Sequence, residues 1–292
     1  MNLGWIGLGI MGAPMCGHLI AAGHTLTVHT RSQVPEAVRA AGARTAASAA
    51  AVAAASDIVF LMLPDTPDVE RVLFGAQGVA AGLKPGTLVV DMSSISPMAT
   101  RDFAARIRAA GSDFLDAPVS GGEVGAKAAS LTIMVGGSDE AFARALPLLQ
   151  AMGRHITHVG GSGDGQTTKV ANQIIVALNI AAVAEALVFA AKAGADPARV
   201  RQALMGGFAG SRILEVHGER MIKRTFNPGF RIGLHQKDLK LALEGARALG
   251  VALPGTAQAA QLMQVCAANG LAEADHSALV KALELMAAHE IG

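Results

Sequence analysis

The motif GLGIMG, residues 7–12, constrains the fold more than any other stretch of this chain. It follows an apolar run at residues 3–7 and precedes a helix-like run at residues 14–22. In such a strand–loop–helix unit, the first glycine makes the tight turn, the second lets a pyrophosphate approach the backbone, and the third lets helix and strand pack. The amides at the start of the helix then bind phosphate. The predicted cofactor-binding residues of this loop are Gly7, Leu8, Gly9, Ile10, Met11 and Gly12.

The first half of the chain alternates short apolar runs with helix-like stretches. The runs are rich in Val, Ile and Leu and lack strict polar alternation, which is typical of strands buried on both faces. This alternation predicts a parallel, doubly wound α/β sheet of the Rossmann type. The predicted strands are 3–7, 26–29, 58–63, 87–91, 114–119, 131–135 and 156–159. The predicted helices between them are 14–22, 35–40, 48–55, 68–74, 97–110 and 138–152.

After the sequence GGSGDG, residues 160–165, the strand-like runs disappear and helical segments follow. Glycines at 194, 250 and 270 stand where helix C-caps are expected. We therefore expect two domains, an NAD(P)-binding Rossmann domain at 1–161 and an all-helical substrate and oligomerisation domain at 162–292. The predicted helices of the second domain are 166–193, 197–205, 214–223, 236–249, 256–268 and 276–288.

The first helix of the second half predicts self-association. Residues 166–193 would form a helix of about 42 Å, too long and too apolar to be covered by a domain of this size. We expect a homodimer or homotetramer formed through the C-terminal helices. Asn179 and Glu185 interrupt the most apolar stretch of this helix, residues 174–191. A buried helix is therefore favoured over a membrane span, and we expect no membrane partner.

Composition excludes several other classes of function. The chain has 24 Lys and Arg against 23 Asp and Glu, and 3% aromatic residues with no Tyr, so neither phosphate-backbone binding nor base stacking is expected. Cys16 and Cys266 match no metal spacing and fit a reducing, cytoplasmic location. We expect no metal site, because His155 and His158, the closest histidine pair, have no nearby carboxylate or third ligand in the sequence. Asp275 or Ser277 is expected to cap the last helix.

The end of the second predicted strand indicates which dinucleotide binds. Enzymes that prefer NAD usually carry an acidic residue about 20 residues after the glycines, where it binds the ribose hydroxyls. This chain has Thr30 and Arg31 there. A guanidinium binds a 2′-phosphate by charge-assisted hydrogen bonds, whereas a carboxylate repels it. The sequence therefore favours NADP(H), with NAD(H) possible and a solvated surface Arg31 as the alternative.

Five motifs in order resemble the β-hydroxyacid dehydrogenase family over essentially the whole chain. They are GLGIMG (7–12), DMSSISP (91–97), DAPVSGG (116–122), GQTTKVANQ (165–173) and HQKDL (235–239). Within the family, the stretches NQIIVALNIAA and ADHSALV look closest to the tartronate semialdehyde reductases. The resemblance implies reversible hydride transfer between a nicotinamide and a small carboxylate-bearing semialdehyde or hydroxyacid, and specifically reduction of tartronate semialdehyde to glycerate.

The resemblance also implies roles for single residues. Lys169 matches the catalytic lysine, and an ammonium suits a carbonyl that becomes an alkoxide, because it supplies a proton and stabilises the developing charge. Asn172 resembles a substrate-orienting amide, although some relatives place that amide one position later, at Gln173. The Ser120, Gly121 and Gly122 loop matches the carboxylate-binding segment. The remaining matches, Leu63, Pro64, Ser94 and Lys237, imply cofactor contacts.

Other functions stay open at this level. Within the family, a 3-hydroxyisobutyrate dehydrogenase or a succinic or glyoxylate semialdehyde reductase differs only in the shape of its pocket. A related imine reductase is disfavoured because those enzymes usually replace the lysine found here at Lys169. A non-catalytic NADP(H)-binding sensor is a further alternative, which the presence of Lys169, Asn172 and Ser120 disfavours.

Overall fold

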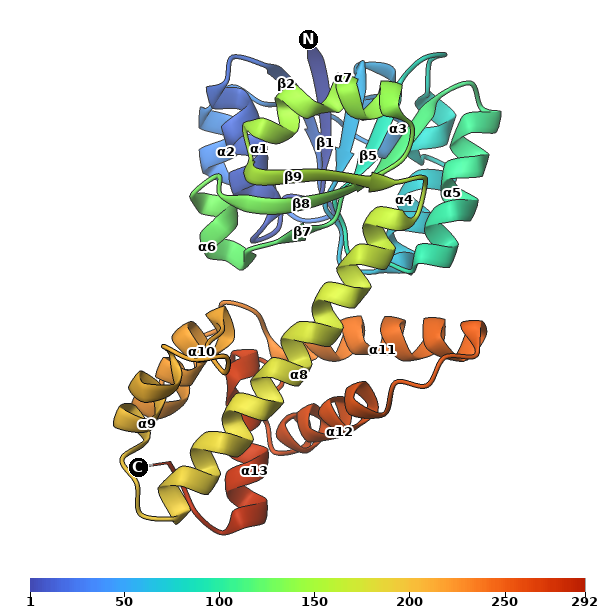
Figure 1. Ribbon diagram of the computed structural model, residues 1–292. Helices are drawn as coiled ribbons and strands as arrows, with labels where there is room; N and C mark the ends of the chain where they lie inside the picture. The colour runs from blue at the N-terminus through green and yellow to red at the C-terminus, as the bar shows by residue number, and fades with distance from the viewer. Residues whose placement is uncertain (292) are drawn as a thin grey trace. The chain divides into compact units, whose positions relative to one another are not determined.

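The computed structural model describes residues 1–291, and the chain divides into two compact units, Met1–Lys169 and Val170–Gly292 (Figure 1). The N-terminal unit contains one sheet, and the C-terminal unit is built from helices, as the sequence predicts. Helix α8 (Asp164–Lys192) begins in the first unit and continues into the second.

The sheet has the strand order β3-β2-β1-β4-β5-β6-β8-β7, with β9 paired to β8. All pairs from β3 through β6 are parallel, which confirms the doubly wound prediction for this part. The strands are β1 (Asn2–Ile6), β2 (Thr25–His29), β3 (Arg44–Thr45), β4 (Ile58–Leu61), β5 (Leu88–Asp91), β6 (Asp113–Asp116), β7 (Val119–Ser120), β8 (Leu131–Gly136) and β9 (Gly153–Gly160).

The part of the sheet that contains β7, β8 and β9 differs from the predicted parallel arrangement. Strand β8 is antiparallel to both β6 and β7, and parallel to β9. A parallel pairing needs a crossover of a dozen or more residues, and the chain between β7 and β8 holds only the six-residue helix α6 (Gly122–Lys127). The single strand predicted at 114–119 is likewise wrong: it is interrupted at Pro118, which has no amide to donate, and the chain forms β6 and β7 separately.

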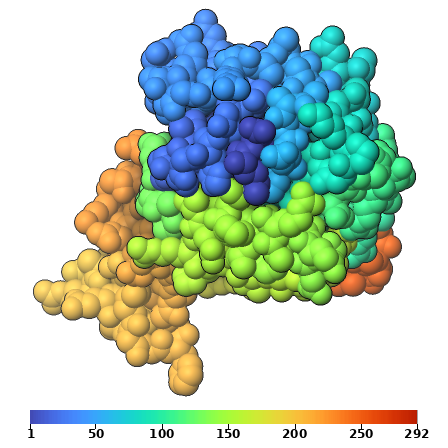
Figure 2. Space-filling model, turned by 90° about the horizontal axis from the view of Figure 1, so that it is seen from above, coloured from blue at the N-terminus to red at the C-terminus, as the bar shows by residue number. Residues whose placement is uncertain are grey.

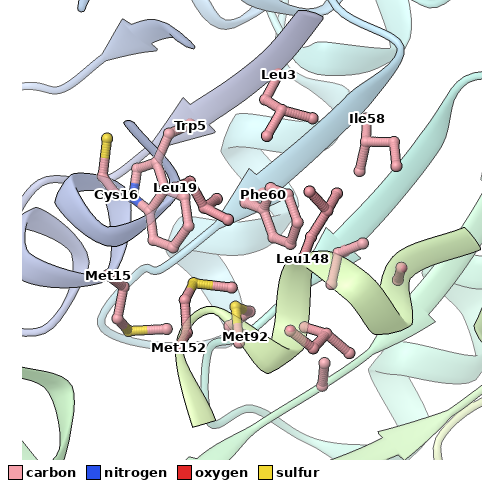
Figure 3. Close-up of a cluster of buried hydrophobic side chains, with 14 of the residues drawn as sticks. Leu3, Trp5, Met15, Cys16, Leu19, Ile58, Phe60, Met92, Leu148 and Met152 are labelled. Carbon is pink, nitrogen blue, oxygen red and sulfur yellow. The ribbon is translucent and has the colours of Figure 1, made fainter. Parts of the chain in front are cut away.

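Helices cover both faces of the sheet and create two apolar layers. On one face, Trp5 stacks on Phe60 with ring centroids 5.4 Å apart, between α1 (Gly12–Ala21) and α7 (Asp139–Gln150) (Figure 3). In the view of Figure 2, the yellow-green residues of α7 form part of the unit's outer surface. The other face packs on α3 (Ala49–Ala54), α4 (Thr66–Phe74) and α5 (Pro97–Ala109). The short elements α2 (Glu36–Ala40) and η1 (Val79–Gly82) complete the unit.

The C-terminal unit contains the predicted helices with small shifts. After α8 come α9 (Pro197–Leu204), α10 (Arg212–Lys223), α11 (Ile232–Leu249), α12 (Pro254–Ala268), η2 (His276–Leu279) and α13 (Val280–Ala287). Helix α11 begins four residues earlier than predicted, so the HQKDL motif is helical throughout. Gly194, Gly250 and Gly270 all have positive φ, as expected for residues that end helices.

Helix α8 is mostly apolar and only partly covered by its own chain. Among residues 1–291 it is the one helix whose length and hydropathy would allow it to cross a membrane, a test that core helices also pass. About 39% of its most apolar window is buried, and Ile175 and Phe189 are exposed.

Candidate functional site

The carboxyl ends of β1, β4, β5 and β6 lie at one edge of the parallel sheet, where ligands bind in open α/β folds. Each of these strands is followed by one of the motifs recognised in the sequence: GLGIMG after β1, Leu63 and Pro64 after β4, DMSSISP at the end of β5, and DAPVSGG at the end of β6. The fold of the N-terminal unit therefore brings residues from four distant parts of the sequence to one edge.

The glycine loop after β1 has the shape that a dinucleotide phosphate requires. Gly7 has φ of +97°, and a Cβ there would lie 2.2 Å from the carbonyl oxygen of Met62, so no other residue fits. A Cβ on Gly12 would lie 2.0 Å from the carbonyl oxygen of Gly7, which explains the close packing of α1 on β1. Gly9 differs, because its Cβ would meet no atom within 4 Å. The backbone at Gly9 is open to a ligand, and the residues present fit a pyrophosphate.

Thr30 and Arg31 directly follow β2, beside the glycine loop. The Arg31 side chain is 82% exposed, and its Nη1 lies 3.6 Å from Oδ1 of Asp68, which is also bound by Arg71. Two guanidinium groups and one carboxylate thus gather on the surface beyond the end of β2. An exposed ion pair of this kind contributes little, so Asp68 does not fix the position of the Arg31 side chain.

Asp116, the last residue of β6, fixes the start of α8. Its carboxylate accepts a hydrogen bond from the Gly163 amide to Oδ1 and one from the Gln166 amide to Oδ2, both at 2.8 Å. Burial raises the pKa of Asp116 to about 6, although these backbone hydrogen bonds lower it. The side chain is fully buried. The first turn of α8 is therefore bound to the ligand edge of the sheet.

Gln166 connects the same turn of α8 to the loop after β5. Its Oε1 accepts the Ile95 amide at 3.1 Å, and its Nε2 donates to the Ser93 carbonyl at 2.7 Å. The hydroxyl of Ser93 in turn accepts the Leu63 amide at 2.9 Å. One buried network thus links the predicted cofactor segments at Leu63 and at DMSSISP to the helix that carries Lys169.

Lys169 lies three residues after Gln166 on α8, hence on the same face of the helix. It is 7% exposed, which is unusual for a lysine. Of the predicted cofactor contacts, Leu63 and Ser94 are half-buried and Pro64 is exposed at the end of its loop. The network around Gln166 holds the segments of Leu63, Ser94 and Lys169 together within the N-terminal unit.

The predicted carboxylate loop follows the short strand β7. Ser120 is half-buried and pairs with Thr132 of β8. Gly121 and Gly122 have φ of +130° and +58°, values that side chains with a Cβ rarely adopt. The loop therefore presents a hydroxyl and backbone amides in a conformation that depends on its glycines, which suits the binding of a carboxylate.

A second polar network lies within the C-terminal unit. It contains the predicted site residues Asn172 and Lys237 and the alternative to Asn172, Gln173. The Asn172 amide donates to Oε1 of Gln173 at 2.7 Å, and Nε2 of Gln173 donates to Oδ2 of Asp238 at 2.6 Å. The Lys237 ammonium lies 3.0 Å from Oδ1 of Asp238. Asp238 thus connects the HQKDL segment of α11 to α8, and Asn172 and Gln173 are coupled by hydrogen bonds.

Of the two histidines that the sequence offered as a metal pair, His158 has other partners. Contrary to the expectation, His158 does have a nearby carboxylate: its Nδ1 lies 3.2 Å from Asp139, while its Nε2 contacts the Gly137 carbonyl. In the described residues, the group with three closely spaced ligand atoms is His217, Asp275 and His276. Asp275 caps η2 through the Ser277 amide, as predicted.

Sequence reasoning missed the residues that support the site. Asp116, Ser93 and Gln166 all stand inside the motifs that carry the family resemblance, yet no role was assigned to them. Two signals were present: an acidic residue at the end of a buried strand, and a glutamine in the first turn of a helix. Neither identifies its partner, because the contacts join residues 30 to 73 positions apart.

Comparison with protein families gives two matches that together span most of the chain. Residues 2–160 match the NAD binding domain of 6-phosphogluconate dehydrogenase. Residues 163–283 match the NAD-binding domain of NADP-dependent 3-hydroxyisobutyrate dehydrogenase. Both expectations for the fold class, a Rossmann-type domain followed by an all-helical domain, are confirmed.

Individual proteins are similar over their full lengths. A 2-hydroxy-3-oxopropionate reductase of Escherichia coli (strain K12) is 62% identical over 291 residues, which cover 100% of both chains. The structure of a Mycobacterium tuberculosis 3-hydroxyisobutyrate dehydrogenase with L-serine superimposes with a TM-score of 0.89 at 35% identity, covering 97% of this chain and 98% of that one. The structure of Psf3 in complex with NADP+ and 2-OPP gives a TM-score of 0.85 at 27% identity, covering 96% and 99%.

The raised pKa of Asp116 predicts a specific pH dependence of stability. Because the folded state binds this proton more tightly than the unfolded state, whose pKa is 3.8, Asp116 favours folding most below pH 4, and this contribution falls as the pH rises to about 6. Replacing it by Asp116→Asn removes the titration. The difference in unfolding free energy between wild type and variant should shrink by about 2 kcal/mol from pH 4 to pH 7, measured by urea denaturation. A difference that is constant over this range contradicts the assignment.

Proposed function

Since this chain belongs to the β-hydroxyacid dehydrogenase family, we propose that it reduces 2-hydroxy-3-oxopropionate, also called tartronate semialdehyde, to glycerate. The chain is an NAD(P)-dependent oxidoreductase. The observation that carries the choice of substrate is its 62% identity, over the full length of both chains, to a 2-hydroxy-3-oxopropionate reductase. Family membership gives no support to the alternative of a non-catalytic sensor.

In the proposed mechanism, the residues of this chain bind the substrate carboxylate and donate one proton to the substrate. The Ser120 hydroxyl and the backbone at Gly121 and Gly122 hold the carboxylate. The dinucleotide, when bound along residues 7–12, supplies the hydride in reduction and accepts it in the reverse direction. Lys169 donates a proton to the aldehyde oxygen as negative charge develops there, and its ammonium stabilises that charge before the proton moves. Asn172, coupled to Gln173, orients the substrate.

The cofactor preference that we propose is NADP(H), with NAD(H) as a weaker alternative. Its support is the exposed Arg31 beyond β2, in a position where NAD-preferring enzymes carry a carboxylate. A structural neighbour, Psf3, was solved with NADP+. Leu63, Pro64, Ser94 and Lys237 are proposed as further cofactor contacts.

A second candidate substrate class follows from the similarity to 3-hydroxyisobutyrate dehydrogenase at a TM-score of 0.89. That substrate is also a small acid with a primary alcohol, so the same carboxylate loop and Lys169 would serve it. The two reactions differ in the groups on the carbon next to the carboxylate.

We propose that the protein is cytoplasmic and forms homo-oligomers through its C-terminal helices. In this proposal, residues 1–161 bind the cofactor, and residues 162–292 contribute to substrate binding and to association. The support is the exposed apolar surface of α8, including Ile175 and Phe189. Phe189 also borders an apolar hollow that α8 forms with Leu283 and Met286 of α13.

The experiment that tests the proposed reaction is a comparison of initial rates. Reduction of tartronate, succinic and methylmalonic semialdehydes is measured with saturating NADPH, and kcat/KM is compared. The proposal expects a clear preference for tartronate semialdehyde. If methylmalonic or succinic semialdehyde is preferred, the substrate assignment is wrong while the lysine mechanism remains.

Lys169→Ala should lower kcat by about 10³-fold or more, because both the proton donor and the charge that stabilises the alkoxide are lost. NADPH affinity, measured by quenching of intrinsic fluorescence, should change little. Lys240→Ala, at an exposed position of α11, is the matched control and should keep full activity. A Lys169→Ala enzyme that retains most of its kcat excludes Lys169 as the proton donor.

Arg31→Ala should raise the Kd for NADPH about ten- to a hundredfold, since charge-assisted hydrogen bonds to a phosphate are lost. The Kd for NADH should change by less than twofold. Arg199→Ala removes another exposed guanidinium, far along the sequence, and serves as the control. Equal losses for NADPH and NADH in Arg31→Ala would refute the 2′-phosphate assignment.

A further inference from the structure

Helix α1, which begins at the glycine loop, also contacts α6, which begins at Gly122 of the predicted carboxylate loop (Figure 1). Nε2 of His18, in the last turn of α1, lies 2.8 Å from the carbonyl oxygen of Ala126 in α6. A carbonyl oxygen only accepts hydrogen bonds, so Nε2 of His18 is the donor. This hydrogen bond joins two segments that are 108 positions apart in the sequence.

Helix α6 has few stabilising features of its own. Two of the six residues in its sequence GEVGAK are glycines, which disfavour a helix. The ion pair between Lys127 and Glu123 lies at the surface and contributes little. The helix is followed by Ala129, whose φ of +51° is unfavourable for a residue with a Cβ. The stability of α6 therefore depends on contacts with other elements.

The carbonyl of Ala126 needs a donor from outside the helix. In a continuing helix it would accept the amide of Ser130, four residues later. That amide instead donates to the Gly125 carbonyl at 2.9 Å. Ala126 is fully buried, and a buried carbonyl without a donor is strongly unfavourable. The imidazole of His18 supplies this donor.

The effect of this hydrogen bond reaches the carboxylate loop through the residue next to Ala126. The Gly125 amide donates to the Gly121 carbonyl at 3.0 Å. A Cβ on Gly121 would lie 3.5 Å from Cα of Gly125, so the two glycines pack backbone against backbone. A shift of α6 would therefore move Gly121, whose amide belongs to the loop proposed to bind the carboxylate.

The other end of the connection is fixed on the sheet. Met15, Cys16 and Leu19 of α1 are fully buried in the apolar layer that covers one sheet face. The same helix thus begins at the glycine loop and, at His18, holds the helix that follows the carboxylate loop. Hydride transfer requires the nicotinamide and the substrate to be held in a defined relative position.

We propose that His18 is a positioning residue for substrate binding, whose hydrogen bond to Ala126 holds the carboxylate loop in its binding conformation relative to the glycine loop. It acts through α6 rather than by contact with the substrate. Without this hydrogen bond, the binding conformation of residues 120–122 is populated for only part of the time, and the apparent affinity for the substrate falls by that fraction. The consequence for turnover rests on the proposed function, whereas the consequence for the order of the loop does not.

The direct test compares amide hydrogen exchange, read by mass spectrometry without ligand, in the full-length wild type and two variants. In His18→Leu the side chain fills the space of the imidazole but has no donor, whereas His18→Gln keeps a donor at similar reach. Residues 120–128 should exchange about tenfold faster in His18→Leu, because the Ala126 carbonyl loses its partner. Helices α5 and α7 should keep their wild-type rates.

His18→Gln should exchange like the wild type over residues 120–128, since the donor is retained. His155→Leu, at an exposed position of β9, is the matched control and should also leave this segment unchanged.

In turnover, the KM for tartronate semialdehyde at saturating NADPH should rise about fivefold in His18→Leu. The kcat should change by less than about twofold, because the contacts of Asp116 and Gln166 hold the turn of α8 before Lys169 independently of His18. The Kd for NADPH should stay at its wild-type value. His18→Gln should restore KM, which a general loss of stability would not explain.

Three results overturn the proposal: unchanged exchange of residues 120–128 in His18→Leu, faster exchange there with an unchanged KM, or a rise in the Kd for NADPH equal to the rise in KM. Because exchange is read without substrate, failure of the wild type to reduce tartronate semialdehyde would refute the proposed function and leave the exchange test of His18 valid.

Discussion

The carboxylate of Asp116 is the interaction on which the placement of Lys169 depends. It ends β6 and accepts hydrogen bonds from two backbone amides at the start of α8, so the first turn of this helix is fixed at the ligand edge of the sheet. Gln166, in the same turn, then binds the loop after β5 through both ends of its amide. Removing either side chain would leave buried backbone groups without partners, which costs about 1–3 kcal/mol for each group.

Much of the N-terminal fold could be predicted because its signals are local. Buried parallel strands are short apolar runs, and GLGIMG combines a strand, a turn that needs positive φ at Gly7 and a helix that packs closely at Gly12. The antiparallel β7 and β8 could not be predicted this way. Their pairing depends on how Pro118 ends one strand and on the short helix α6, whose sequence GEVGAK has low helix propensity.

The same distinction between local signals and long-range contacts applies to the candidate site. Lys169 and Ser120, which lie within recognisable motifs, and Arg31, which follows the second predicted strand, were found from the sequence, and their roles stay predictions. The contacts that hold them were not found, because Asp116, Ser93 and Gln166 act on partners far away in the sequence. The choice between Asn172 and Gln173 is likewise changed by a tertiary contact: both amides belong to one network that ends on Asp238, so they orient as a unit.

The central claim is that α8 presents Lys169 to the reacting oxygen of a substrate whose carboxylate is bound by residues 120–122. A crystal structure of the chain with NADP+ and glycerate tests this most directly. The account predicts that Nζ of Lys169 lies about 3 Å from the primary hydroxyl of glycerate, within hydrogen-bond distance, and that the glycerate carboxylate contacts Ser120 and the backbone of the following glycines. A glycerate hydroxyl bound by another donor, with Lys169 out of reach, would contradict it.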